Sequence, residues 1–495
     1  MLAWTIYISF LGAAGLVLLP PGSRRAARMV ALLTALAGLA LALVGTAQYE
    51  QRATSDTLLE LVKIPWIAAL GISFHLAADG VSVTLVLLTG IAAVAGVLFS
   101  WNVERRTREF FAFYLALIGG VYGVFLSFDL FLLFVFYEIA IIPKYFLIAV
   151  WGSTRREYGA MKLALYSFAG SAMVMIGLIA AYVVSGAQSF DLLDLAKQSY
   201  PAAFQHWAFL LVFVGFAVLA GLWPFHTWAP TGHVAAPTAA SMLLAGVVMK
   251  LGAYGALRVA MTLFPEGLRY WQNAIALLAV IGIVYGGTVA LVQRDIKFVI
   301  GYSSVSHMGF VLLGLMTLSQ IGLSGAVLQM FSHGIIAGLL FAVVGRMIYD
   351  RTHTRELSEL EPMNLGVLAP FAALTFVIAG AASMGLPGFS GFIAELQVLT
   401  GAWAVFPRLT LLAGVGILVG IAFMVRVWIK AFFGESQGQA GAIQIEPITI
   451  PERAGACLLL GATVLIGLWP GLLLNLITPT LRSPLFQPLL KGGQP

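Results

Sequence analysis

Residues 221–258 decide the fold, and they read G-L-W-P-F-H-T-W-A-P-T-G-H-V-A-A-P-T-A-A-S-M-L-L-A-G-V-V-M-K-L-G-A-Y-G-A-L-R. An apolar helix arrives from the N-terminal side, and we expect Pro224 and Pro230 to break it, because proline lacks the N–H that a helix interior needs. The apolar helix that follows carries Lys250 near its middle. A broken helix beside a buried charge is typical of membrane transport proteins.

The composition indicates an integral membrane protein. Of 495 residues, 60% are hydrophobic and 10% are charged, and the mean hydropathy is +0.97. The net charge of +6 does not indicate nucleic-acid binding, because the basic residues lie in short loops between apolar runs. A single cysteine, Cys457, excludes disulfides, thiolate zinc sites and iron–sulfur ligation within this chain. We therefore expect no redox cofactor in it, and no metal either, because no carboxylate–histidine spacing resembles a metal site.

The apolar runs predict about fourteen membrane-spanning helices, since a span needs roughly 20 residues at 1.5 Å each. The first run, 2–19, is interpreted as a helix and not a signal peptide, because its arginines follow it instead of preceding it. The expected spans are 2–19, 28–48, 78–101, 110–127, 130–150, 160–184, 206–228, 238–264, 272–292, 297–318, 322–348, 366–404, 408–433 and 454–478.

A second broken helix is expected in the long span 366–404, because residues 386–391 read L-P-G-F-S-G. The five spans from 110 to 264 and the five from 272 to 433 each have a broken helix in fourth place. An odd number of spans inverts the second copy, which predicts two inverted repeats. The predicted division is residues 1–105 for helices 1–3, 106–265 and 270–433 for the repeats, and 434–495 for a cytoplasmic loop and helix 14.

The basic residues predict the orientation, because translocated loops avoid lysine and arginine. Alternate loops carry Arg24, Arg25 and Arg28; Arg105, Arg106 and Arg108; Arg155 and Arg156; Arg294 and Lys297; and Arg351 and Arg355. These loops are expected on the cytoplasmic side, so both termini are expected outside. The connection 48–78 is long enough to hold an extracytoplasmic strand or an amphipathic segment, and its sequence does not decide between them.

Few ionisable residues lie inside the expected spans, and each needs a reason, because a charge at a helix centre costs on the order of 2.5–3.5 kcal/mol. The candidates for an ion pathway are four charged residues and three histidines: Glu138, Lys144, Lys250, Glu395, His226, His307 and His333.

Two interpretations exist for the charged pair of the first repeat. Glu138 is either a structural ion-pair partner or a proton-accepting carboxylate whose proton affinity a nearby lysine controls. Lys250 is too deep to reach water easily, so its ammonium must either pair, with Glu138 for example, or release its proton. A lysine that releases its proton can pass protons along a pathway.

The histidines and the last carboxylate also have two interpretations each. His307 and His333 are either hydrogen-bonded core histidines or members of a hydrated polar file with their serine and tyrosine neighbours. Glu395, just after the second break, suits an exit to water on the outer side, and the alternative is a helix cap or a partner for a lysine of a neighbouring subunit. At the first break, water or His226 is expected to satisfy the freed carbonyls.

These residues lie in motifs that resemble the antiporter-like membrane subunits of respiratory complex I. The resemblance covers about residues 110–433 and rests on F-Y-E-I-A-I-I-P-K-Y-F-L-I-A-V-W-G, P-F-H-T-W-A-P, A-P-T-A-A-S-M-L-L-A-G-V-V-M-K-L-G-A-Y-G, Y-S-S-V-S-H-M-G, F-S-H-G and L-P-G-F-S-G-F-I-A-E. The run R-T-H-T-R at 351–355 favours the subunit 4 or chain M type. The resemblance implies a water-filled polar axis through Glu138, Lys250, His307, His333 and Glu395.

One departure from the family pattern concerns Leu219. The family usually has a lysine five residues before the first proline of the broken helix, paired with the glutamate at the position of Glu138. Lys144 is six residues after Glu138 and Pro143 can bend the turn between them. Lys144 therefore either replaces the missing lysine or extends its ammonium to the cytoplasmic face.

The resemblance implies a proton-translocating subunit of a bacterial NADH:quinone oxidoreductase, in the cytoplasmic membrane. Flavin, iron–sulfur clusters and quinone are then expected in partner subunits, and the expected partners are other membrane subunits, including antiporter-like paralogues, and the lipid bilayer. Three alternatives share most of the motifs or follow from the departure at Leu219: a chain of a multisubunit cation/proton antiporter, a membrane subunit of an energy-converting hydrogenase, and a purely structural anchor.

Overall fold

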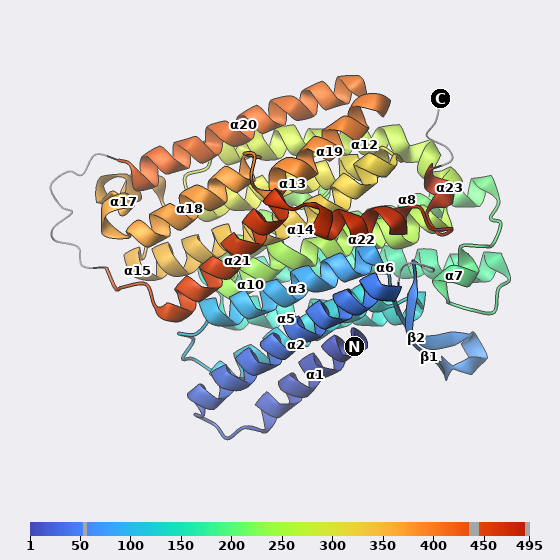
Figure 1. Cartoon of the computed structure of the whole chain (residues 1–495), viewed down its shortest axis with the longest axis horizontal. Helices are drawn as coiled ribbons and strands as arrows, with labels where there is room; N and C mark the ends of the chain where they lie inside the picture. Colours follow the sequence, from blue (N-terminus) through green and yellow to red (C-terminus); the bar gives the residue numbers. More distant parts are fainter. Residues whose placement is uncertain (53–56, 435–444, 491–495) are drawn as a thin grey trace.

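The protein is a bundle of long, roughly parallel and antiparallel helices with a small β-hairpin at one end (Figure 1). A computed structural model describes residues 1–52, 57–434 and 445–490. Within these residues, twelve helical stretches are long and apolar enough to cross a membrane. The fold is that of an all-α polytopic membrane protein.

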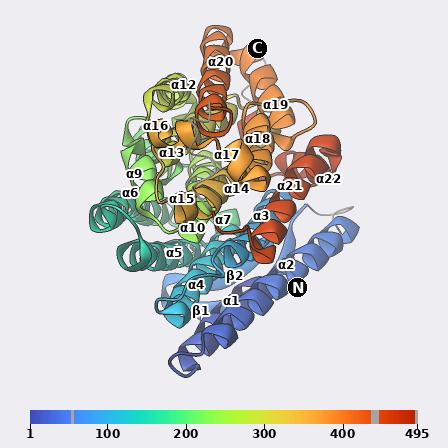
Figure 2. The same cartoon turned by 90° about the vertical axis from the view of Figure 1, so that its left-hand side faces the viewer.

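The centre and the edges of the bundle differ in burial. The stretches Thr238–Met261 and Gln320–Thr352 are completely buried in their most apolar windows, whereas Arg24–Arg52 and Pro407–Phe432 are only 33% and 28% buried. Figure 2 shows α1 and α2 along one edge and α20 along the opposite edge. The two central stretches carry Lys250 and His333, so the candidate pathway lies in the core of the bundle.

The first part of the chain contains six apolar helices and the hairpin. Each predicted span up to residue 184 coincides with a helix to within a few residues. The elements are α1 (Ala3–Leu18), α2 (Arg24–Arg52), β1 (Leu59–Ile67), η1 (Ala68–Leu70), β2 (Ile72–Ala78), α3 (Gly80–Phe99), α4 (Thr107–Leu126), α5 (Leu130–Trp151) and α6 (Arg156–Ser185).

The middle of the chain contains the first broken helix and the two buried central helices. Its elements are α7 (Leu192–Leu195), α8 (Ala202–Ala220), η2 (Phe225–Thr227), α9 (Trp228–Ala235), α10 (Thr238–Leu243), η3 (Leu244–Val248), α11 (Met249–Gly255), η4 (Ala256–Met261), α12 (Pro265–Val292), α13 (Ile296–Met316), α14 (Gln320–Ala342) and η5 (Val343–Tyr349).

The last part contains the second broken helix and the C-terminal helices. Its elements are α15 (Asp350–Thr352), α16 (Leu357–Leu360), η6 (Glu361–Met363), α17 (Leu365–Leu368), α18 (Pro370–Ser383), α19 (Ser390–Val405), α20 (Pro407–Phe432), α21 (Ile450–Leu468), α22 (Gly471–Leu481) and α23 (Gln487–Leu490). Residues 435–444 of the predicted cytoplasmic loop lie outside the described residues.

The open choice for residues 48–78 is decided in favour of strands. β1 and β2 pair antiparallel, from Leu59 opposite Ala78 to Ile67 opposite Ile72. The hairpin follows α2 and therefore lies at the end of the bundle opposite the α1–α2 turn. Leu2 packs on Gly45 near the end of α2, and Tyr49 Oη lies 3.2 Å from Thr480 Oγ1 near the end of α22, so the first and last spanning helices also reach the hairpin end.

The two breaks are confirmed in position and corrected in detail. α8 ends at Ala220, and the chain unwinds up to Pro224 before η2 and α9 begin. Pro230 does not break the helix as predicted, because it occupies the first turn of α9, where its missing N–H has no partner to lose. The second break separates α18 from α19, and Gly385 and Gly388 in it have φ of +71° and +96°.

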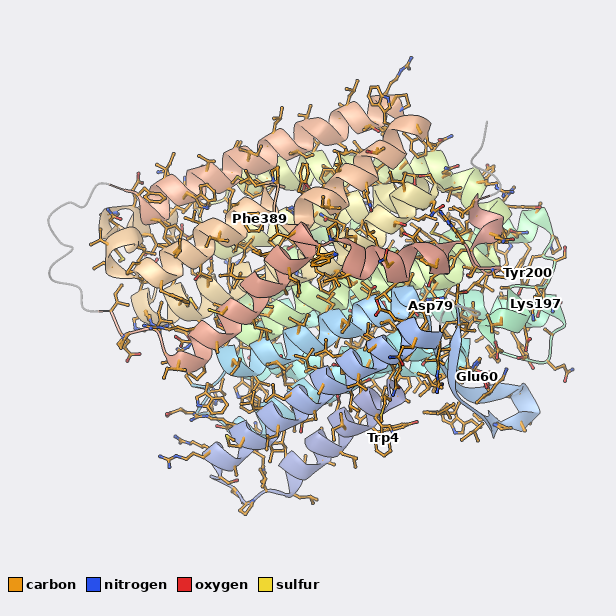
Figure 3. The ribbon with its side chains drawn as sticks, in the orientation of Figure 1. Trp4, Glu60, Asp79, Lys197, Tyr200 and Phe389 are labelled. Carbon is orange, nitrogen blue, oxygen red and sulfur yellow. The ribbon has the colours of Figure 1, made fainter. Side chains whose placement is uncertain are left out.

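The predicted single helix 454–478 is wrong, because it is broken at Trp469 and Pro470 into α21 and α22. This third break packs on the second one: a Cβ on Gly467 would lie 2.3 Å from Gly388 O and 2.5 Å from the Phe389 backbone. Figure 3 marks Phe389 at this junction. The sequence repeat predicts two breaks only, and the repeats themselves stay a prediction.

Three segments of the central helices are π-helical: η3, η4 and η5. A π segment widens the turn, leaves backbone carbonyls less well paired and is often found at functional sites. Each one has a buried cation in or next to it: Lys250 two residues after η3, Arg258 in η4 and Arg346 in η5. Of these three cations, Lys250 donates a hydrogen bond to a carbonyl of its π segment, Ala245 O of η3.

Candidate functional site

Lys250 lies at the centre of a buried polar run. Its side chain is fully buried, and its Nζ donates a short hydrogen bond to Ala245 O, a carbonyl of η3. The same Nζ lies 2.8 Å from Nδ1 of His333 on α14. Ala245 O and an unprotonated His333 Nδ1 are both hydrogen-bond acceptors, so an ammonium on Lys250 can donate to both of them. One of its protons then points at the His333 ring.

The run continues through two stacked histidines to Glu395. The rings of His333 and His307 are parallel within 11°, with centroids 5.3 Å apart. His307 Nε2 lies 3.6 Å from Glu395 Oε1, and Gln329 Nε2 donates to the same carboxylate oxygen at 3.2 Å. The structure thus brings together Lys250, His333, His307 and Glu395 from four helices, whereas the axis that the resemblance implies also includes Glu138.

A small polar cavity joins the last three of these groups. It has a volume of about 10 Å³, and its lining includes His307, His333, Gln329 and Glu395. This volume is about the size that one water molecule needs. His333 Nε2 is buried without a protein hydrogen-bond partner, so a water in this cavity can connect it to the carboxylate.

The second break places Glu395 and one acceptor of His307. α18 ends at Ser383, and Ser383 O, freed by the break, lies 3.0 Å from His307 Nε2. A Cβ on Gly385 would lie 2.7 Å from Glu395 Oε2, so the carboxylate occupies the space that this glycine leaves. The unwound backbone therefore builds part of the site, as expected where a helix breaks inside a membrane.

The pair in the first half of the chain is not joined in the same way. Lys144 is fully buried, which contradicts the interpretation that its ammonium reaches the cytoplasmic face. Its Nζ, Glu138 Oε1 and Ser167 Oγ are all buried without a hydrogen-bond partner. Lys250 bonds His333 and not Glu138, so the interpretation of a Glu138–Lys250 ion pair is wrong too.

Leu219 occupies the position where the family has its lysine, and it lies at a tight helix crossing. Its side chain is 1% exposed. A Cβ on Gly252 of α11 would lie 2.4 Å from Phe216 O and 2.5 Å from Ala220 N of α8. Tyr137, next to Glu138, packs edge-on against Phe216, so Leu219 lies between the helices that carry Glu138 and Lys250.

The expectation that the carbonyls freed at the first break are satisfied by water, or else by His226, stays a prediction. Both of its ring nitrogens are buried without a partner, and its ring packs edge-on against Tyr285 at 5.2 Å. The freed carbonyl of Val218 instead accepts a 2.7 Å hydrogen bond from the Trp228 indole. Trp228, the second tryptophan of W-P-F-H-T-W, therefore caps the C-terminal end of α8. Its indole N–H is a hydrogen-bond donor that the sequence analysis did not consider as a capping group.

A buried ion pair that was not predicted ties α3 to η4. Arg258 is fully buried, and its guanidinium nitrogens lie 2.6 and 2.7 Å from the two carboxylate oxygens of Asp79. Arg258 Nε also donates to Tyr254 Oη at 3.2 Å. The sequence feature that could have indicated this pair is Arg258 itself, the last residue of 221–258, because it lies in an otherwise apolar helix. This pair lies away from the Lys250 run and locks two central helices together.

Two further polar connections tie the C-terminal helix α21 to the core. Ser390 Oγ lies 2.7 Å from Ser332 Oγ, beside His333, and 2.9 Å from Thr463 Oγ1 of α21. Glu452, 1% exposed, accepts from Arg346 at 2.5 Å and from Arg351 at 2.7 Å. Single serine, threonine and loop arginine residues carry no distinctive spacing, so the sequence offered no signal for these contacts.

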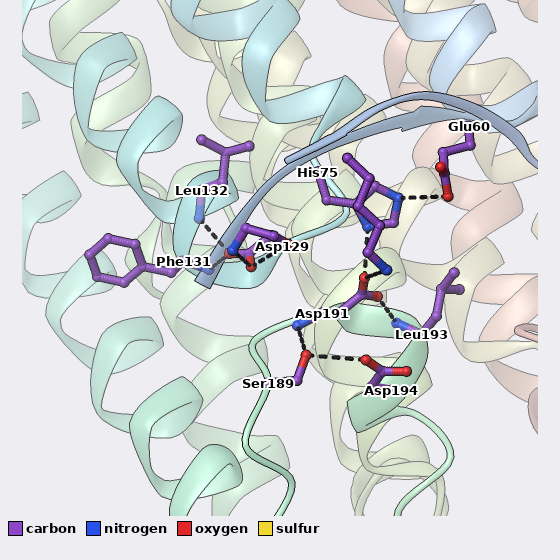
Figure 4. A network of polar contacts seen from close by, with 11 residues as sticks. Glu60, His75, Asp129, Phe131, Leu132, Ser189, Asp191, Leu193 and Asp194 are labelled. Atoms are coloured by element: carbon purple, nitrogen blue, oxygen red, sulfur yellow. Dashed lines mark hydrogen bonds and ion pairs between the residues drawn. The ribbon is translucent and has the colours of Figure 1, made fainter. Parts of the chain in front are cut away.

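A separate cluster holds the hairpin to the loops at its end (Figure 4). Asp191 accepts hydrogen bonds from His75 Nδ1 at 2.8 Å and Lys63 Nζ at 2.7 Å. Burial alone would raise the pKa of Asp191, but these two hydrogen bonds outweigh it and lower the pKa to about 2. The same contact raises the pKa of Lys63. The cluster is a clamp on the hairpin and is distant in sequence from the Lys250 run.

The bundle, its breaks and the buried polar run define a polytopic membrane protein of the antiporter-like class. The chain belongs to the family described as "NADH:quinone oxidoreductase/Mrp antiporter, TM", which matches residues 127–421. This match covers both breaks and all seven predicted site residues.

Curated relatives and solved structures agree with this family. The chain is 37% identical to NADH-quinone oxidoreductase subunit M of Rhodobacter capsulatus, over 84% of this chain and 82% of that protein. It is 35% identical to subunit M of Pseudomonas aeruginosa, over 98% and 97%. A chain of respiratory complex I from Thermus thermophilus matches at TM-score 0.89 and 27% identity over the full length of both chains. A chain of the Mrp complex from a Dietzia species, at TM-score 0.85 and 21% identity over 99% of both chains, shares the fold.

Proposed function

We propose that this chain translocates protons as a membrane subunit of an NADH:quinone oxidoreductase. The observation that carries the proposal is the buried run from Lys250 through His333 and His307 to Glu395, with contacts of 2.8 to 3.6 Å at its two ends. Four titratable groups in contact inside a membrane core are costly, and proton transfer is the function that explains their retention.

The proton moves in short steps along this run. The Lys250 ammonium gives a proton to His333 Nδ1, and the ring releases one from Nε2 towards the small cavity. His307 and Glu395 receive it there and release it towards the hairpin end of the bundle. The first step joins two atoms that lie 2.8 Å apart, and the step from His333 Nε2 uses a water in the small cavity as its carrier.

Gating is necessary because a continuous proton path would short-circuit the membrane. Moving one charge against 100 mV takes about 2.3 kcal/mol. In the proposed mechanism, quinone reduction elsewhere in the complex changes the charge balance near Glu138, and this change alters the proton affinity of Lys250. The tight packing of α8 on α11 around Leu219 and Gly252 supports such a coupling between the two sites.

Lys144 replaces the lysine that the family has at the position of Leu219. Its Nζ and Glu138 Oε1 are both buried and unpartnered on the same helix, and Pro143 interrupts the hydrogen bonding between them. A buried ammonium without a partner is strongly disfavoured, so the retention of Lys144 indicates that Glu138 and water compensate its charge.

The proposal also concerns partners and orientation. The redox groups, flavin, iron–sulfur clusters and quinone, reside in partner subunits, and antiporter-like paralogues flank this chain in the membrane. The arginine-rich loops face the cytoplasm and the hairpin end faces outwards, so both termini lie outside, in agreement with the preference of basic loops for the cytoplasmic side.

The test uses the intact complex in inverted membrane vesicles. Lys250→Ala combined with Glu395→Gln is expected to abolish quinone-dependent proton uptake, measured by a pH-sensitive dye, while the complex still assembles. Lys430→Ala is the control, because Lys430 forms a partly exposed ion pair with Glu361 at the bundle edge. Native proton uptake in the double variant would refute the proposal.

The main alternative is a chain of a multisubunit cation/proton antiporter, because a chain of the Mrp complex has the same fold. The higher identity to NADH-quinone oxidoreductase subunits favours the complex I assignment. Mass spectrometry of the purified complex separates the two: flavin and iron–sulfur subunits are expected, and their absence would favour the antiporter. A nickel–iron subunit would instead indicate a hydrogenase.

A further inference from the structure

A polar cavity lies at the arginine-rich end of the bundle, where the α1–α2 turn meets the start of α4. It has a volume of about 240 Å³ and is lined by residues 21–24 of the turn, by Glu104 and by residues 106–109. At roughly 30 Å³ for each water molecule, this volume has room for a phosphate group and part of the glycerol attached to it. The lining shares no residue with the Lys250 run or with the hairpin clamp.

Positive charge exceeds negative charge around this cavity. Residues 20–28 and 102–109 contain six arginines and two glutamates, which leaves a net charge of six minus two, or +4. The arginines are Arg24, Arg25, Arg28, Arg105, Arg106 and Arg108, and the acids are Glu104 and Glu109. An anion is therefore the kind of ligand that this cavity favours.

Arg24 and Arg106, both of which line the cavity, keep guanidinium donors for such a ligand. Within the described residues, Arg24 pairs with Glu104 through Nη1 at 3.2 Å, and Arg106 pairs with Glu109 through Nε at 3.8 Å. Each guanidinium has five N–H donors in a planar fork that matches the oxygens of a phosphate. Each ion pair uses one nitrogen of its fork, so the other donors can contact a phosphate.

Two other arginines hold the walls of the cavity together. Arg108 Nη1 donates to Leu19 O at 2.7 Å, and Arg28 Nη2 donates to Val103 O at 3.2 Å. These two hydrogen bonds tie the α1–α2 turn to the loop before α4 in both directions. Arg28 Nε is buried without a hydrogen-bond partner. The protein itself therefore builds the cavity, and its arginines still offer more donors than the surrounding chain satisfies.

The helices that lead to the cavity present apolar side chains on their outer faces. Val17 and Leu18 at the end of α1 are 62% and 84% exposed, and Met29 and Leu33 of α2 are 46% and 59% exposed. Basic residues that directly follow an apolar span lie at the level of the lipid head groups. A lipid whose phosphate lies in the cavity can place its acyl chains on these faces, which a free phosphate ion does not use.

We propose that this cavity binds the head group of an anionic glycerophospholipid, whose phosphate contacts Arg24 and Arg106 and whose acyl chains lie along the outer faces of α1 and α2. The bound lipid joins the α1–α2 corner to α4 at the membrane surface. The site is separate from the Lys250 run, so this inference goes beyond the proposed function and does not depend on it.

The first test measures lipid binding at this corner of the purified, intact complex. A phosphatidylglycerol with a photoreactive acyl chain is titrated in at 0.15 M salt, and label on peptides of α1 and α2 is quantified by mass spectrometry. Arg24→Gln with Arg106→Gln is expected to raise the half-saturating lipid concentration at least about tenfold, because one basic side chain at a membrane surface contributes about fivefold. Both side chains are about half exposed, so the fold tolerates the change.

The matched control is Arg25→Gln with Arg105→Gln. It removes the same charge from exposed positions of the same turn and loop that do not line the cavity. Charges more than about 8 Å apart are largely screened at this salt concentration, so the control is expected to label at the native concentration. Equal labelling curves for the two double variants would overturn the proposal, because the arginines would then act only as a general surface charge.

A second measurement uses the native chain and so does not depend on any variant. Unlabelled phosphatidylglycerol is expected to displace the photoreactive lipid from α1 and α2, whereas the same concentration of phosphatidylcholine, which has no net charge, is expected to leave the label in place. Equal displacement by phosphatidylcholine would show that the arginines do not select the head group and would overturn the proposal. Displacement by millimolar inorganic phosphate alone would overturn it too, because it would identify a site for free phosphate.

Discussion

The two halves of the polar interior satisfy their charges in different ways. In the second half, Lys250, His333, His307 and Glu395 form a run of contacts across four helices. In the first half, Glu138 Oε1 and Lys144 Nζ are buried on one helix without a partner. The second half is a run of polar contacts, whereas the first half holds buried ionisable atoms without hydrogen-bond partners.

Leu219 lies between the helices that carry Glu138 and Lys250. A lysine there would place its ammonium on α8, between the helices of Glu138 and Lys250, and would pair two helices through one contact. With leucine at that position, α8 contributes only packing there, and the one lysine near Glu138 on the same helix is Lys144 of α5. The comparison teaches that the two halves differ in whether their ionisable side chains contact one another.

The largest expected loss of proton translocation is at Glu395, the last residue of the run in the second half. Glu395→Gln keeps the shape of the side chain but removes the proton acceptor at the last contact of the run. We expect proton translocation to fall at least about a hundredfold, the lower end of what a positioned acid or base contributes. Proton-to-electron ratios in inverted vesicles measure this, with Gln397→Glu as a control for charge alone near the same helix turn. An unchanged ratio would break the distinction between the halves.

The second-largest loss of proton translocation is expected at Lys144, the lysine of the first half. Lys144→Leu removes the only cation that the structure describes on the helix of Glu138, and we expect coupled proton uptake to be abolished or strongly reduced while the complex assembles. The measurement is dye-detected uptake in inverted vesicles. Unchanged pumping would show that Lys144 does not replace the missing family lysine, and Lys162→Leu on α6 is the matched control.

A double variant sharpens the same point. Leu219→Lys restores the family pattern, so we expect it to make Lys144 dispensable: Lys144→Leu with Leu219→Lys should recover most of the uptake that Lys144→Leu loses. The physical reason is that either ammonium can compensate Glu138 in a low-dielectric site. A double variant as inactive as Lys144→Leu alone, although assembled, would show that the two lysines are not equivalent.

The smallest effect is expected at the hairpin clamp, which lies outside both halves. Asp191 has a pKa of about 2, below the usual 3.8, so the stability it contributes is present above about pH 4 and is lost as the pH falls towards 2. We expect Asp191→Asn to speed amide exchange in β1 and β2 several-fold at pH 7, and the native hairpin to loosen at pH 3. Mass-spectrometric hydrogen exchange measures both.

Asp194→Asn is the control for this clamp. Asp194 accepts only from Ser189 in the cluster, so its amide variant should leave hairpin exchange at the native rate. Proton translocation is expected to be near native in both variants. A strong loss of translocation in Asp191→Asn would mean that the clamp belongs to the pathway.

Local properties of the sequence were enough to predict much of the architecture. Apolar runs predict spans because burial in lipid depends on each segment alone, and all fourteen expected spans fall on helices or on broken pairs within the described residues. Glu138, Lys144, Lys250 and Glu395 could be singled out for the same reason, since each charge in a span has a cost that must be compensated wherever it lies.

Only the tertiary structure decided which groups meet. The partner of Lys250 is His333, 83 residues away, and not Glu138, because contacts between helices depend on how distant faces of the bundle pack. The burial of Lys144, the third break at Trp469 and the Asp79–Arg258 pair follow from the same non-local packing. The sequence determined which buried side chains need a polar partner, and the packing of the bundle determined which residue is that partner.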